Sequence, residues 1–261
     1  MLKVRIVKVD LSARKTENTI DYVAEEKPLH IFLNRTRYVT VFCSPSRLKE
    51  LAVGHVVSEG MVKSLAEIDG IDLKEKEGIC RIKLHGDVKI DERVKLSQHF
   101  SRVIFSACGS NTPYQPSFRV EKIVLDLKVK AETLSNCVNR LNFIAETFRK
   151  TGGVHVAAIY GGDGTLITFA EDVGRHNAVD KVIGSCIMKG IDVRNCFLAL
   201  SGRLTGDIVL KAAKTGMPIV ASLAAALDSG IAIAKDVRLT LVGFVRGRRM
   251  NVYSFPERIL A

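Results

Sequence analysis

The stretch Val154-His-Val-Ala-Ala-Ile-Tyr-Gly-Gly-Asp-Gly-Thr-Leu-Ile-Thr-Phe-Ala170 decides the fold. Two runs rich in apolar residues, Val154–Tyr160 and Thr165–Ala170, flank the turn Gly161-Gly-Asp-Gly164. Strand-like runs that are separated by a short glycine-rich turn predict a β-hairpin. This hairpin begins a sheet, because helical and strand-like patterns alternate after it.

The alternation continues to residue 254 and predicts a layered α/β arrangement with a mixed sheet. Helices are recognised by apolar residues at a spacing of three and four, and strands by short β-branched runs. The predicted segments are helix Asn177–Met188, strand Cys196–Leu200, helix Gly206–Lys214, strand Pro218–Ser222, a helix capped near Asp228, and strands Leu239–Val245 and Asn251–Ser254.

Before the hairpin, one long helix is predicted over roughly residues 131–149, because seven apolar residues form a single stripe that Gly152 and Gly153 end. Residues 1–106 contain short strand-like runs and one helix with Ser46 as its N-cap. We therefore expect a β-rich part at 1–106, a loop and linker at 107–130, and an α/β domain at 131–261. The strand-like runs of the first part are Val4–Val9, Leu29–Asn34, Tyr38–Cys43 and Ile79–Leu84.

The composition is that of a globular protein, since 47% of the 261 residues are hydrophobic. The beginning of the chain alternates apolar and charged residues, and the longest apolar run, near residues 219–227, is too short to span a bilayer. We therefore expect a cytoplasmic protein that does not enter membranes. Its six cysteines form no Cys-x-x-Cys pair, which predicts reduced thiols.

Lysine and arginine exceed aspartate and glutamate by 39 − 28 = +11, a surplus that favours anionic partners. Nucleic acids, phosphorylated cofactors and acidic protein surfaces all fit this charge. A basic surface that only contacts solvent fits it as well.

One cysteine differs in its surroundings from the other five. Cys108 follows the apolar run Val103-Ile-Phe105 and begins a segment with one glycine and two prolines, so we expect it in an accessible loop. A thiolate there can exchange sulfur with a persulfide, although a single loop cysteine is also commonly an inert thiol. The remaining cysteines, at positions 43, 80, 137, 186 and 196, lie in predicted strands and helices and should be buried.

Two predicted strand-to-helix junctions carry basic and small residues. Glu171–Asp180 contains Gly174, Arg175, His176 and Asn177, and Leu200–Asp207 contains Ser201, Gly202 and Arg203. Helix starts offer free N–H groups and a positive dipole to an anion, and both junctions should share one edge of the sheet. Taken singly, His176 can instead cap the helix, and each arginine can be an exposed charge.

A third basic segment, Gly243–Asn251, is predicted as a strand running into a turn. Arginine side chains suit phosphate groups, and an aromatic ring can stack on a base. An ordinary basic hairpin turn is the alternative interpretation. The candidate residues are Phe244, Val245, Arg246, Gly247, Arg248 and Arg249.

Three stretches together resemble the signatures of the formate dehydrogenase accessory sulfurtransferases, the FdhD family. They are Gly152-Gly-Val-His155, Glu171-Asp-Val-Gly-Arg-His-Asn-Ala-Val-Asp-Lys181 and Leu239-Thr-Leu-Val-Gly-Phe-Val-Arg-Gly-Arg248, with Ser201-Gly-Arg203 between the last two. The resemblance covers most of the chain and is strongest from Cys108 onward.

The resemblance implies a sulfur carrier. Members of this family accept persulfide sulfur from a cysteine desulfurase and deliver it to the molybdenum cofactor of formate dehydrogenase. Cys108 corresponds to the persulfide-bearing cysteine, and residues 244–249 correspond to the segment associated with bis-molybdopterin guanine dinucleotide. A homodimer is implied as well, and a related molybdoenzyme can be the recipient.

The family is similar in fold to the cytidine deaminases, which implies a three-layer core with a mixed sheet over residues 131–261. Zinc deaminases need His or Cys two residues before a catalytic Glu, and Pro-Cys-x-x-Cys at a later helix start. The corresponding positions here are Arg175-His-Asn177 and Ser201-Gly-Arg203. We therefore expect neither zinc nor deaminase chemistry.

The loop departs from the pattern of the family at Asn111, where many members carry a second cysteine in Cys-Gly-x-Cys. One thiol can still hold and donate a persulfide, but a disulfide within the loop cannot form. A cofactor-binding chaperone without sulfur transfer is therefore an alternative function. A nucleic-acid-binding module ranks last, because aromatic residues make up only 6% of the chain and no recognised motif is present.

Overall fold

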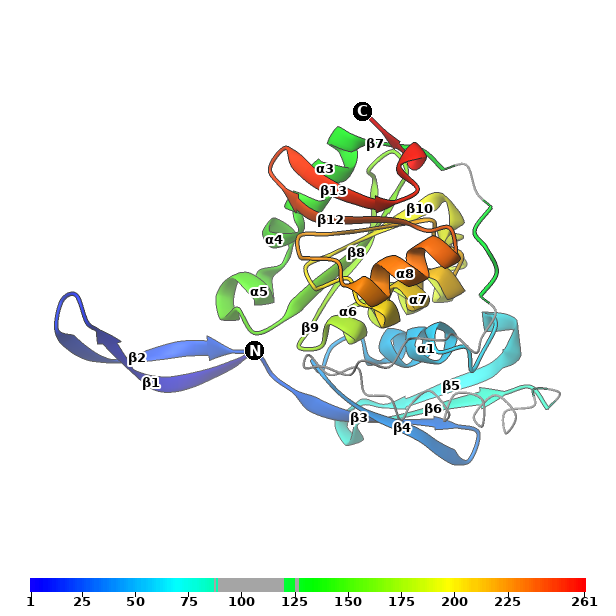
Figure 1. Ribbon diagram of the computed structural model, residues 1–261. Coiled ribbons are helices and arrows are strands. Elements are labelled where there is room, and N and C mark those ends of the chain that lie inside the picture. Colours follow the sequence, from blue (N-terminus) through cyan, green and yellow to red (C-terminus); the bar gives the residue numbers. More distant parts are fainter. Residues whose placement is uncertain (87, 89–119, 125–126) are drawn as a thin grey trace.

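The computed structural model describes residues 1–86, 88, 120–124 and 127–261 (Figure 1). Cys108 and the loop around it lie outside the described residues. Along the part of the chain that the structure describes, no helix combines the length and apolar character needed to span a bilayer.

The chain begins with a hairpin that projects from the body (Figure 1). Strands β1 (Leu2–Asp10) and β2 (Lys15–Val23) pair with each other in antiparallel register. The sequence predicted the first strand but not the second. β2 reads Lys-Thr-Glu-Asn-Thr-Ile-Asp-Tyr-Val and has no apolar alternation, because its side chains are mostly exposed.

A four-stranded sheet follows, in the order β4-β3-β6-β5. Its alternate residues, such as Leu29, Ile31 and Leu33, pack against helix α1 (Leu48–Ser58). The predicted N-cap was wrong, because Arg47, in a left-handed conformation, occupies that position instead of Ser46. The bounds are β3 Lys27–Leu33, β4 Thr36–Cys43, β5 Ile68–Lys74 and β6 Ile79–Leu84, with short 3-10 turns at Leu65–Glu67 and Glu75–Glu77. Strand β5 was not predicted from the sequence.

The second half contains a six-stranded mixed sheet in the order β13-β12-β11-β10-β8-β9. Strands β10, β11 and β12 are parallel, whereas β8 runs antiparallel to β10, so the predicted mixed sheet is confirmed. The bounds are β8 His155–Gly161, β9 Leu166–Asp172, α6 Arg175–Met188, β10 Cys196–Leu200, α7 Gly206–Lys214, β11 Ile219–Ser222, α8 Asp228–Asp236, β12 Thr240–Arg246 and β13 Arg249–Ser254. Shorter elements are β7 Val129–Lys130, β14 Ile259–Leu260, and 3-10 turns at Val193–Asn195 and Pro256–Arg258.

The predicted long helix over 131–149 is broken into α3 (Ala131–Asn139), α4 (Leu141–Ile144) and α5 (Glu146–Thr151). Ala145 has extended backbone angles and ends α4. The helix restarts because the Glu171 carboxylate accepts hydrogen bonds from the backbone N–H groups of Thr147 and Phe148, at 3.2 and 2.7 Å. A distant carboxylate thus satisfies the free donors of a new helix start.

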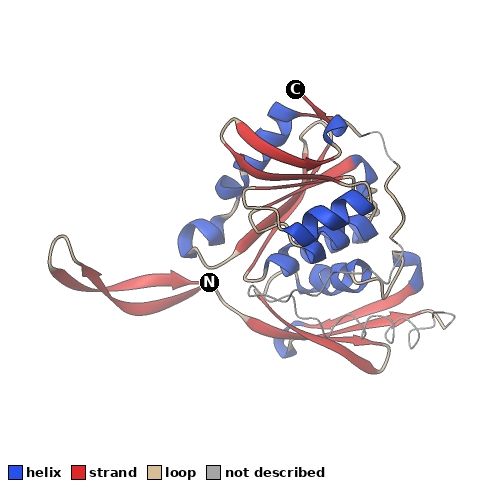
Figure 2. Cartoon of the chain, in the orientation of Figure 1, coloured by secondary structure: helices blue, strands red, loops and turns tan. Residues whose placement is uncertain are grey.

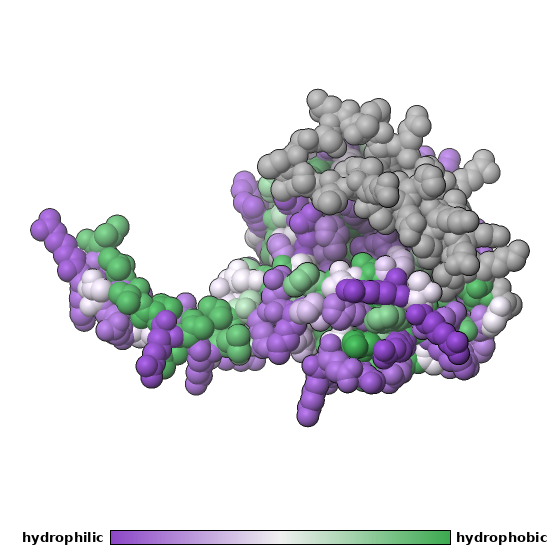
Figure 3. Space-filling view, turned by 90° about the horizontal axis from the view of Figure 1, so that it is seen from below, coloured by the Kyte–Doolittle hydropathy of each residue, from purple (hydrophilic) through white to green (hydrophobic). Residues whose placement is uncertain are grey.

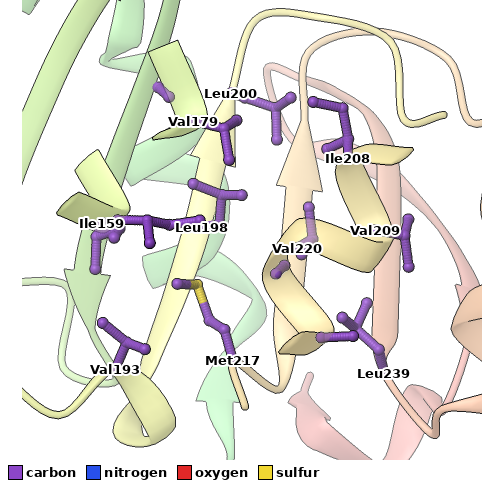
Figure 4. Close-up of a cluster of buried hydrophobic side chains, with 14 of the residues drawn as sticks. Ile159, Val179, Val193, Leu198, Leu200, Ile208, Val209, Met217, Val220 and Leu239 are labelled. Carbon is purple, nitrogen blue, oxygen red and sulfur yellow. The ribbon is translucent and has the colours of Figure 1, made fainter. Parts of the chain in front are cut away.

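Helices cover both faces of the six-stranded sheet (Figure 2). One hydrophobic cluster joins the sheet to α6, α7 and α8, and Figure 4 shows part of it. A second cluster joins the opposite face to α3 and α4. Each fully buried aliphatic side chain in these clusters stabilises the fold by about 1.5–3 kcal/mol. The five described cysteines are buried free thiols, as predicted.

The two sheets are joined through helices α1 and α6, which cross at glycines. A Cβ on Gly54 would lie 1.8 Å from the backbone oxygen of Asp180, and a Cβ on Gly184 would lie 2.0 Å from that of Glu50. Only glycine permits this close backbone approach. The first part of the chain is therefore fixed against the helix that begins with the most distinctive motif.

Candidate functional site

The candidate residues lie along one edge of the six-stranded sheet. Leu200 pairs with Ser222 on one side and with Ala157 on the other, and Ala221 pairs with Val242. The chain therefore leaves β10, β11 and β12 at this edge and enters β8 there. Strand β9 also ends there, because Asp172 pairs with His155. The prediction that the two strand-to-helix junctions share an edge is confirmed, and the loop after β12 lies on the same edge.

The junction before α6 is held rigidly by buried polar contacts. Asp172 accepts hydrogen bonds from the backbone of Ser44 at 3.1 Å and of Gly174 at 2.9 Å. Lys181, in the second turn of α6, pairs with Asp172 and donates to the Ser44 carbonyl oxygen at 3.0 Å. Asp172 and Lys181, two polar residues of this motif, therefore hold the backbone of the junction in place.

Asn177 takes part in the same support. Its side-chain Nδ2 donates to Asp172 and to the carbonyl oxygen of Phe42, at 2.9 and 2.8 Å, and the residue is buried. Gly174 is the N-cap of α6, and a Cβ there would lie 2.8 Å from this nitrogen. The binding role predicted for Asn177 stays a prediction, and its amide nitrogen is already occupied by the protein.

Arg175 begins α6 and lies against the second junction. A Cβ on Gly202 would be 3.0 Å from Cβ of Arg175 and 3.6 Å from Nδ1 of His155, so the three residues are in close proximity. Burial lowers the pKa of Arg175, and the nearby Arg203 lowers it further. Its Nε is buried and has no hydrogen-bond partner among the described residues. A donor of this kind is satisfied when an anion or another acceptor binds.

The second junction, residues 201–205, is fixed by two serines. Ser201 Oγ accepts a hydrogen bond from the backbone N–H of Val156 at 3.0 Å. Ser222 Oγ lies 3.0 Å from the Leu200 carbonyl oxygen and 2.6 Å from that of Gly202, and it accepts from the N–H of Ala224. These contacts join the loop after β10 to the loop after β11.

Thr205 occupies the N-cap of α7 but makes no capping bond. The residue is 7% exposed, and its Oγ1 has no partner in the described part of the chain. Arg203, two residues earlier, is exposed and lowers the pKa of both Arg175 and His155. The start of α7 therefore combines a helix dipole, an exposed guanidinium group and a buried hydroxyl group without a partner.

Two histidines near these arginines are held neutral. Burial lowers the pKa of His155, and Arg175 and Arg203 lower it further. Burial also lowers the pKa of His176 to about 4, with Arg175 and Lys211 as the next causes. The His176 Nε2 is buried without a partner within residues that the structure describes. Neutral imidazoles can donate or accept a hydrogen bond without adding charge.

Strand β12 ends in an irregular turn that exposes two of the predicted residues. Phe244 has a φ of +51°, and its backbone N–H donates to the Ala224 carbonyl oxygen at 2.9 Å. The Arg246 guanidinium lies 5.4 Å from the Phe244 ring centroid, while its Nε donates to the Leu223 carbonyl oxygen at 3.3 Å. Val245 points into the core, so only its backbone can face a ligand.

The tip of this hairpin is attached to α3. Ser135 Oγ and Asn139 Nδ2 both donate to the Gly247 carbonyl oxygen, at 2.6 and 3.0 Å. Arg248 and Arg249 are exposed beside it. The turn therefore presents arginines on a backbone that the neighbouring helix holds in place.

A pocket of about 400 Å³ opens at the same edge. It lies between the edge loops and the glycines that follow α5. Its lining residues are Asn142, Phe148, Gly152, Gly153, Val154, His155, Val173, Ser201 and Leu223. Together with Arg175 against Gly202, the edge offers a small cavity, positive charge and unused hydrogen-bonding groups. This arrangement suits the binding of a phosphorylated or otherwise anionic molecule.

A buried charged cluster lies where α1, α6 and α7 meet, and it was not predicted from the sequence. Asp180 lies 3.0 Å from both His55 Nδ1 and Lys211 Nζ, and Lys211 also pairs with Glu59 at 2.6 Å. Burial by itself would raise the pKa of Asp180, but Lys211 and His55 outweigh it and lower that pKa. Polar residues inside the apolar helix 48–58, such as His55 and Ser58, were the available signal.

Three further residues at this edge were not predicted as site residues, namely His155, Thr205 and Ser222. His155 belongs to the Gly152–His155 signature, so the motif itself was the signal. Within residues 1–86, 88, 120–124 and 127–261, no three His, Cys, Asp or Glu side chains form a group that could hold a metal ion. The expected absence of zinc stays a prediction.

Comparison with known proteins covers nearly the whole chain. The model of the FdhD/NarQ family matches residues 24–260. A sulfur carrier protein FdhD from Shouchella clausii (strain KSM-K16) is 36% identical over 244 residues, which cover 92% of this chain and 90% of that protein. A protein of the same name from Staphylococcus aureus (strain Newman) is 35% identical over 251 residues, or 94% of this chain and 92% of that one.

The fold has a counterpart among solved structures. A crystal structure described as that of a formate dehydrogenase accessory protein, from Desulfotalea psychrophila, superimposes with a TM-score of 0.79. Its sequence is 26% identical, and the match covers 99% of both chains. The likeness therefore includes the four-stranded sheet and the six-stranded sheet.

Proposed function

The chain belongs to the FdhD/NarQ family, and from this premise we propose that it takes persulfide sulfur from a cysteine desulfurase onto Cys108 and delivers it to bis-molybdopterin guanine dinucleotide. The relatives are named sulfur carrier proteins, and a solved neighbour is described as a formate dehydrogenase accessory protein. We propose formate dehydrogenase, or a related molybdoenzyme, as the destination of the sulfurated cofactor.

The cationic edge is the observation that carries this proposal. Arg175 and Thr205, at the starts of two neighbouring helices, each hold a buried polar atom without a partner in the described residues. Arg203 adds an exposed positive charge beside them. An anionic dinucleotide would neutralise these charges and accept from the unused donors. We propose Gly174–His176 and Ser201–Arg203 as contacts for its phosphate groups.

The exposed end of β12 and the turn that follows it would hold the other end of the same ligand. Phe244 is 37% exposed and can stack on a purine, and Arg246 is already fixed above its ring. We propose that residues 244–249 hold a guanine portion of the cofactor. Because Val245 is buried, its contribution there is limited to the backbone.

The loading step on Cys108 is a thiol exchange. The Cys108 thiolate attacks the terminal sulfur of the desulfurase persulfide, a new S–S bond forms on Cys108, and the desulfurase cysteine leaves as a thiolate. No oxidant is needed, because the sulfane sulfur changes partners without a net change of electrons. Asn111 in place of a second cysteine means that one thiol performs this step.

Several finer expectations accompany this function as proposals. We propose that residues 131–261 share the cytidine deaminase arrangement, which is supported by the helices α3–α5, the hairpin β8–β9 and the alternating helices and strands after it. We also propose that the chain divides into a β-rich part at 1–106, a loop and linker at 107–130, and an α/β domain at 131–261. The protein would act in the cytoplasm as a homodimer, without zinc.

Intact-protein mass spectrometry tests the sulfur step. The parent and Cys108→Ala would be incubated with a cysteine desulfurase and cysteine under matched conditions. We expect the parent to gain one sulfur atom, which a reductant removes, and the variant to gain none. A Cys108→Ala protein that gains as much sulfur as the parent would refute the assignment. Cys137→Ala, which removes a buried thiol, is the matched control.

A cofactor-binding chaperone without sulfur transfer is the second candidate. It is favoured by one observation, namely that the described residues Arg175, Arg203 and Thr205 already offer positive charge and unused hydrogen-bonding groups to an anion. This function predicts that Cys108→Ala binds guanosine diphosphate as tightly as the parent, while the parent gains no sulfur. Arg203→Gln should weaken that binding under either function, and Arg238→Gln, far from the edge, should not. Calorimetric titration would separate these outcomes.

A further inference from the structure

A second pocket lies on the side of the body away from the projecting hairpin β1–β2, where residues 120–124 run past helices α1 and α7 (Figure 1). This pocket, the linker pocket, has a volume of about 520 Å³, and its walls lie within residues 57–63, 120–124, 194 and 213–216. Arg194 precedes β10 and Gly216 precedes β11, whereas the candidate site lies where these strands end. The linker pocket is therefore at the opposite edge of the six-stranded sheet from the candidate site.

Lys214 brings a partly buried ammonium group to the wall of this pocket. Its Nζ donates to the Glu59 carbonyl oxygen at 3.1 Å, and a Cβ on Gly60 would lie 3.8 Å from it. Burial lowers the pKa of Lys214, and the raising effect of Glu59 does not outweigh it. The Glu59 carboxylate also pairs with Lys211, at 2.6 Å. The nearby carboxylates therefore compensate the charge of Lys214 only in part, and a bound anion would complete the compensation.

Two further lysines, Lys63 and Lys122, line the pocket, are exposed and form no ion pair within the described part of the chain. Arg194 lines it too, but its guanidinium pairs with Asp192 at 2.7 Å. The lining carries four basic side chains, at positions 63, 122, 194 and 214, and two acidic ones, at positions 59 and 121. The ends of α1 and α7 add about half a negative charge each. The balance is still positive, which favours an anion.

Part of the lining is apolar and buried. Val57 and Val62 belong to the hydrophobic cluster of the four-stranded sheet, and Ile123 and Ala213 belong to a cluster of the six-stranded sheet. The pocket thus lies between the two cores. Cavities of roughly 300–1,000 Å³ that combine apolar walls with a few polar groups are typical of small-molecule sites. The charges and the apolar walls together fit an anion that carries a carbon skeleton.

We propose that the linker pocket binds a small organic phosphate. Lys63, Lys122 and Lys214 hold its phosphate group, and the buried valine and isoleucine side chains of the lining contact its carbon skeleton. A phosphate monoester carries about two negative charges above pH 7, and ammonium groups bind phosphate as point charges. Helix α7 begins at the candidate site and ends at this pocket, so about 13 Å of helix separates the two sites. A ligand in one does not exclude a ligand in the other.

Phenyl phosphate is the probe for this site, and benzyl alcohol is its neutral counterpart. Nuclear magnetic resonance would follow the backbone amides of Gly60 and Gly216, which line the pocket, in protein that is saturated with guanosine diphosphate so that the candidate site is filled. We expect phenyl phosphate to shift both amide signals saturably and benzyl alcohol to shift neither. Benzoate, with a single charge, should bind more weakly than phenyl phosphate. Equal or tighter binding of either comparison compound would overturn the choice of an organic phosphate.

Substitutions of the two exposed lysines locate the phosphate group. Lys63→Gln and Lys122→Gln should each weaken the binding of phenyl phosphate about fivefold, as for the loss of one exposed ion pair. Both side chains are exposed, so each variant should fold as the parent does. Lys8→Gln is the matched control, because it removes an exposed lysine from the hairpin that projects from the body (Figures 1 and 3). Unchanged affinity in the double variant, or no saturable shift in the parent, would refute the site.

Failure of this site and failure of the proposed function give different results. Arg203→Gln should weaken the binding of guanosine diphosphate and leave the phenyl phosphate shifts of Gly60 and Gly216 unchanged. If Arg203→Gln abolished those shifts, phenyl phosphate would be bound at the candidate site and the linker pocket would be ruled out. Sulfur loading at Cys108 is measured separately by mass spectrometry and does not depend on either result.

Discussion

Nζ of Lys181 lies 2.6 Å from Oδ2 of Asp172, and both side chains are entirely buried. The pair connects α6 to the end of β9, and each partner also contacts Ser44 in the first part of the chain. The junction that carries Arg175 is therefore positioned by residues from both halves of the protein. Its geometry depends on the correct docking of the two sheets.

Loss of this ion pair should destabilise the protein strongly. Lys181→Met leaves the Asp172 carboxylate buried without its cation, and we expect unfolding to become easier by about 3–5 kcal/mol. Urea denaturation followed by circular dichroism would measure the change. Lys235→Met, on the exposed side of α8, should change stability by less than about 0.5 kcal/mol. A loss below about 1 kcal/mol for Lys181→Met would contradict a structural role for the pair.

Gly202→Ala should weaken ligand binding without unfolding the protein. The added Cβ would lie 3.0 Å from Cβ and 3.2 Å from Cδ of Arg175, so the arginine must move by a few tenths of an ångström. We expect the affinity for guanosine diphosphate to fall about tenfold, as for one misplaced charged hydrogen bond. Calorimetry would compare the variant with Gly70→Ala, where an added Cβ meets nothing within 4 Å. Equal affinities would remove Arg175 from the binding site.

Thr205→Val should separate stability from binding. The substitution conserves shape and removes a buried hydroxyl group that has no partner in the described residues. We therefore expect the free protein to be unchanged or more stable by about 1 kcal/mol, while guanosine diphosphate binds more weakly. Thermal unfolding with and without the nucleotide would measure both effects. A destabilised variant with unchanged affinity would show that the hydroxyl group serves the fold.

Acid should destabilise the protein through His176 before the carboxylates protonate. Burial lowers the pKa of this imidazole from 6.5 to about 4. Between those values the unfolded chain binds a proton that the native protein excludes, so stability falls as the pH falls through this window. We expect His176→Gln to flatten the stability profile between pH 6.5 and 4, as measured by urea unfolding. The exposed His85→Gln should leave the profile of the parent unchanged in shape.

Prediction from sequence worked best where the apolar pattern was strong. Strand Cys196–Leu200 and helix Gly206–Lys214 have the predicted bounds, because their buried faces decide their structure locally. The long helix at 131–149 was wrong, since a carboxylate from residue 171 starts a new helix there. The Ser46 cap was wrong because Arg47 adopts the left-handed conformation at that position. Both errors arise from contacts or backbone states that residue patterns do not encode.

The sequence by itself determined the mixed α/β sheet, the five buried cysteines and the shared edge of the two junctions, because periodicity is a local property of the chain. Its signature stretches indicated the family. Only the tertiary structure decided which polar side chains are free. Asn177 and Lys181 are occupied by Asp172, Phe42 and Ser44, whereas Arg175 and Thr205 retain buried atoms without a partner among the described residues. The physical reason is that hydrogen-bond satisfaction depends on groups that are distant in sequence and meet only when the two halves pack together.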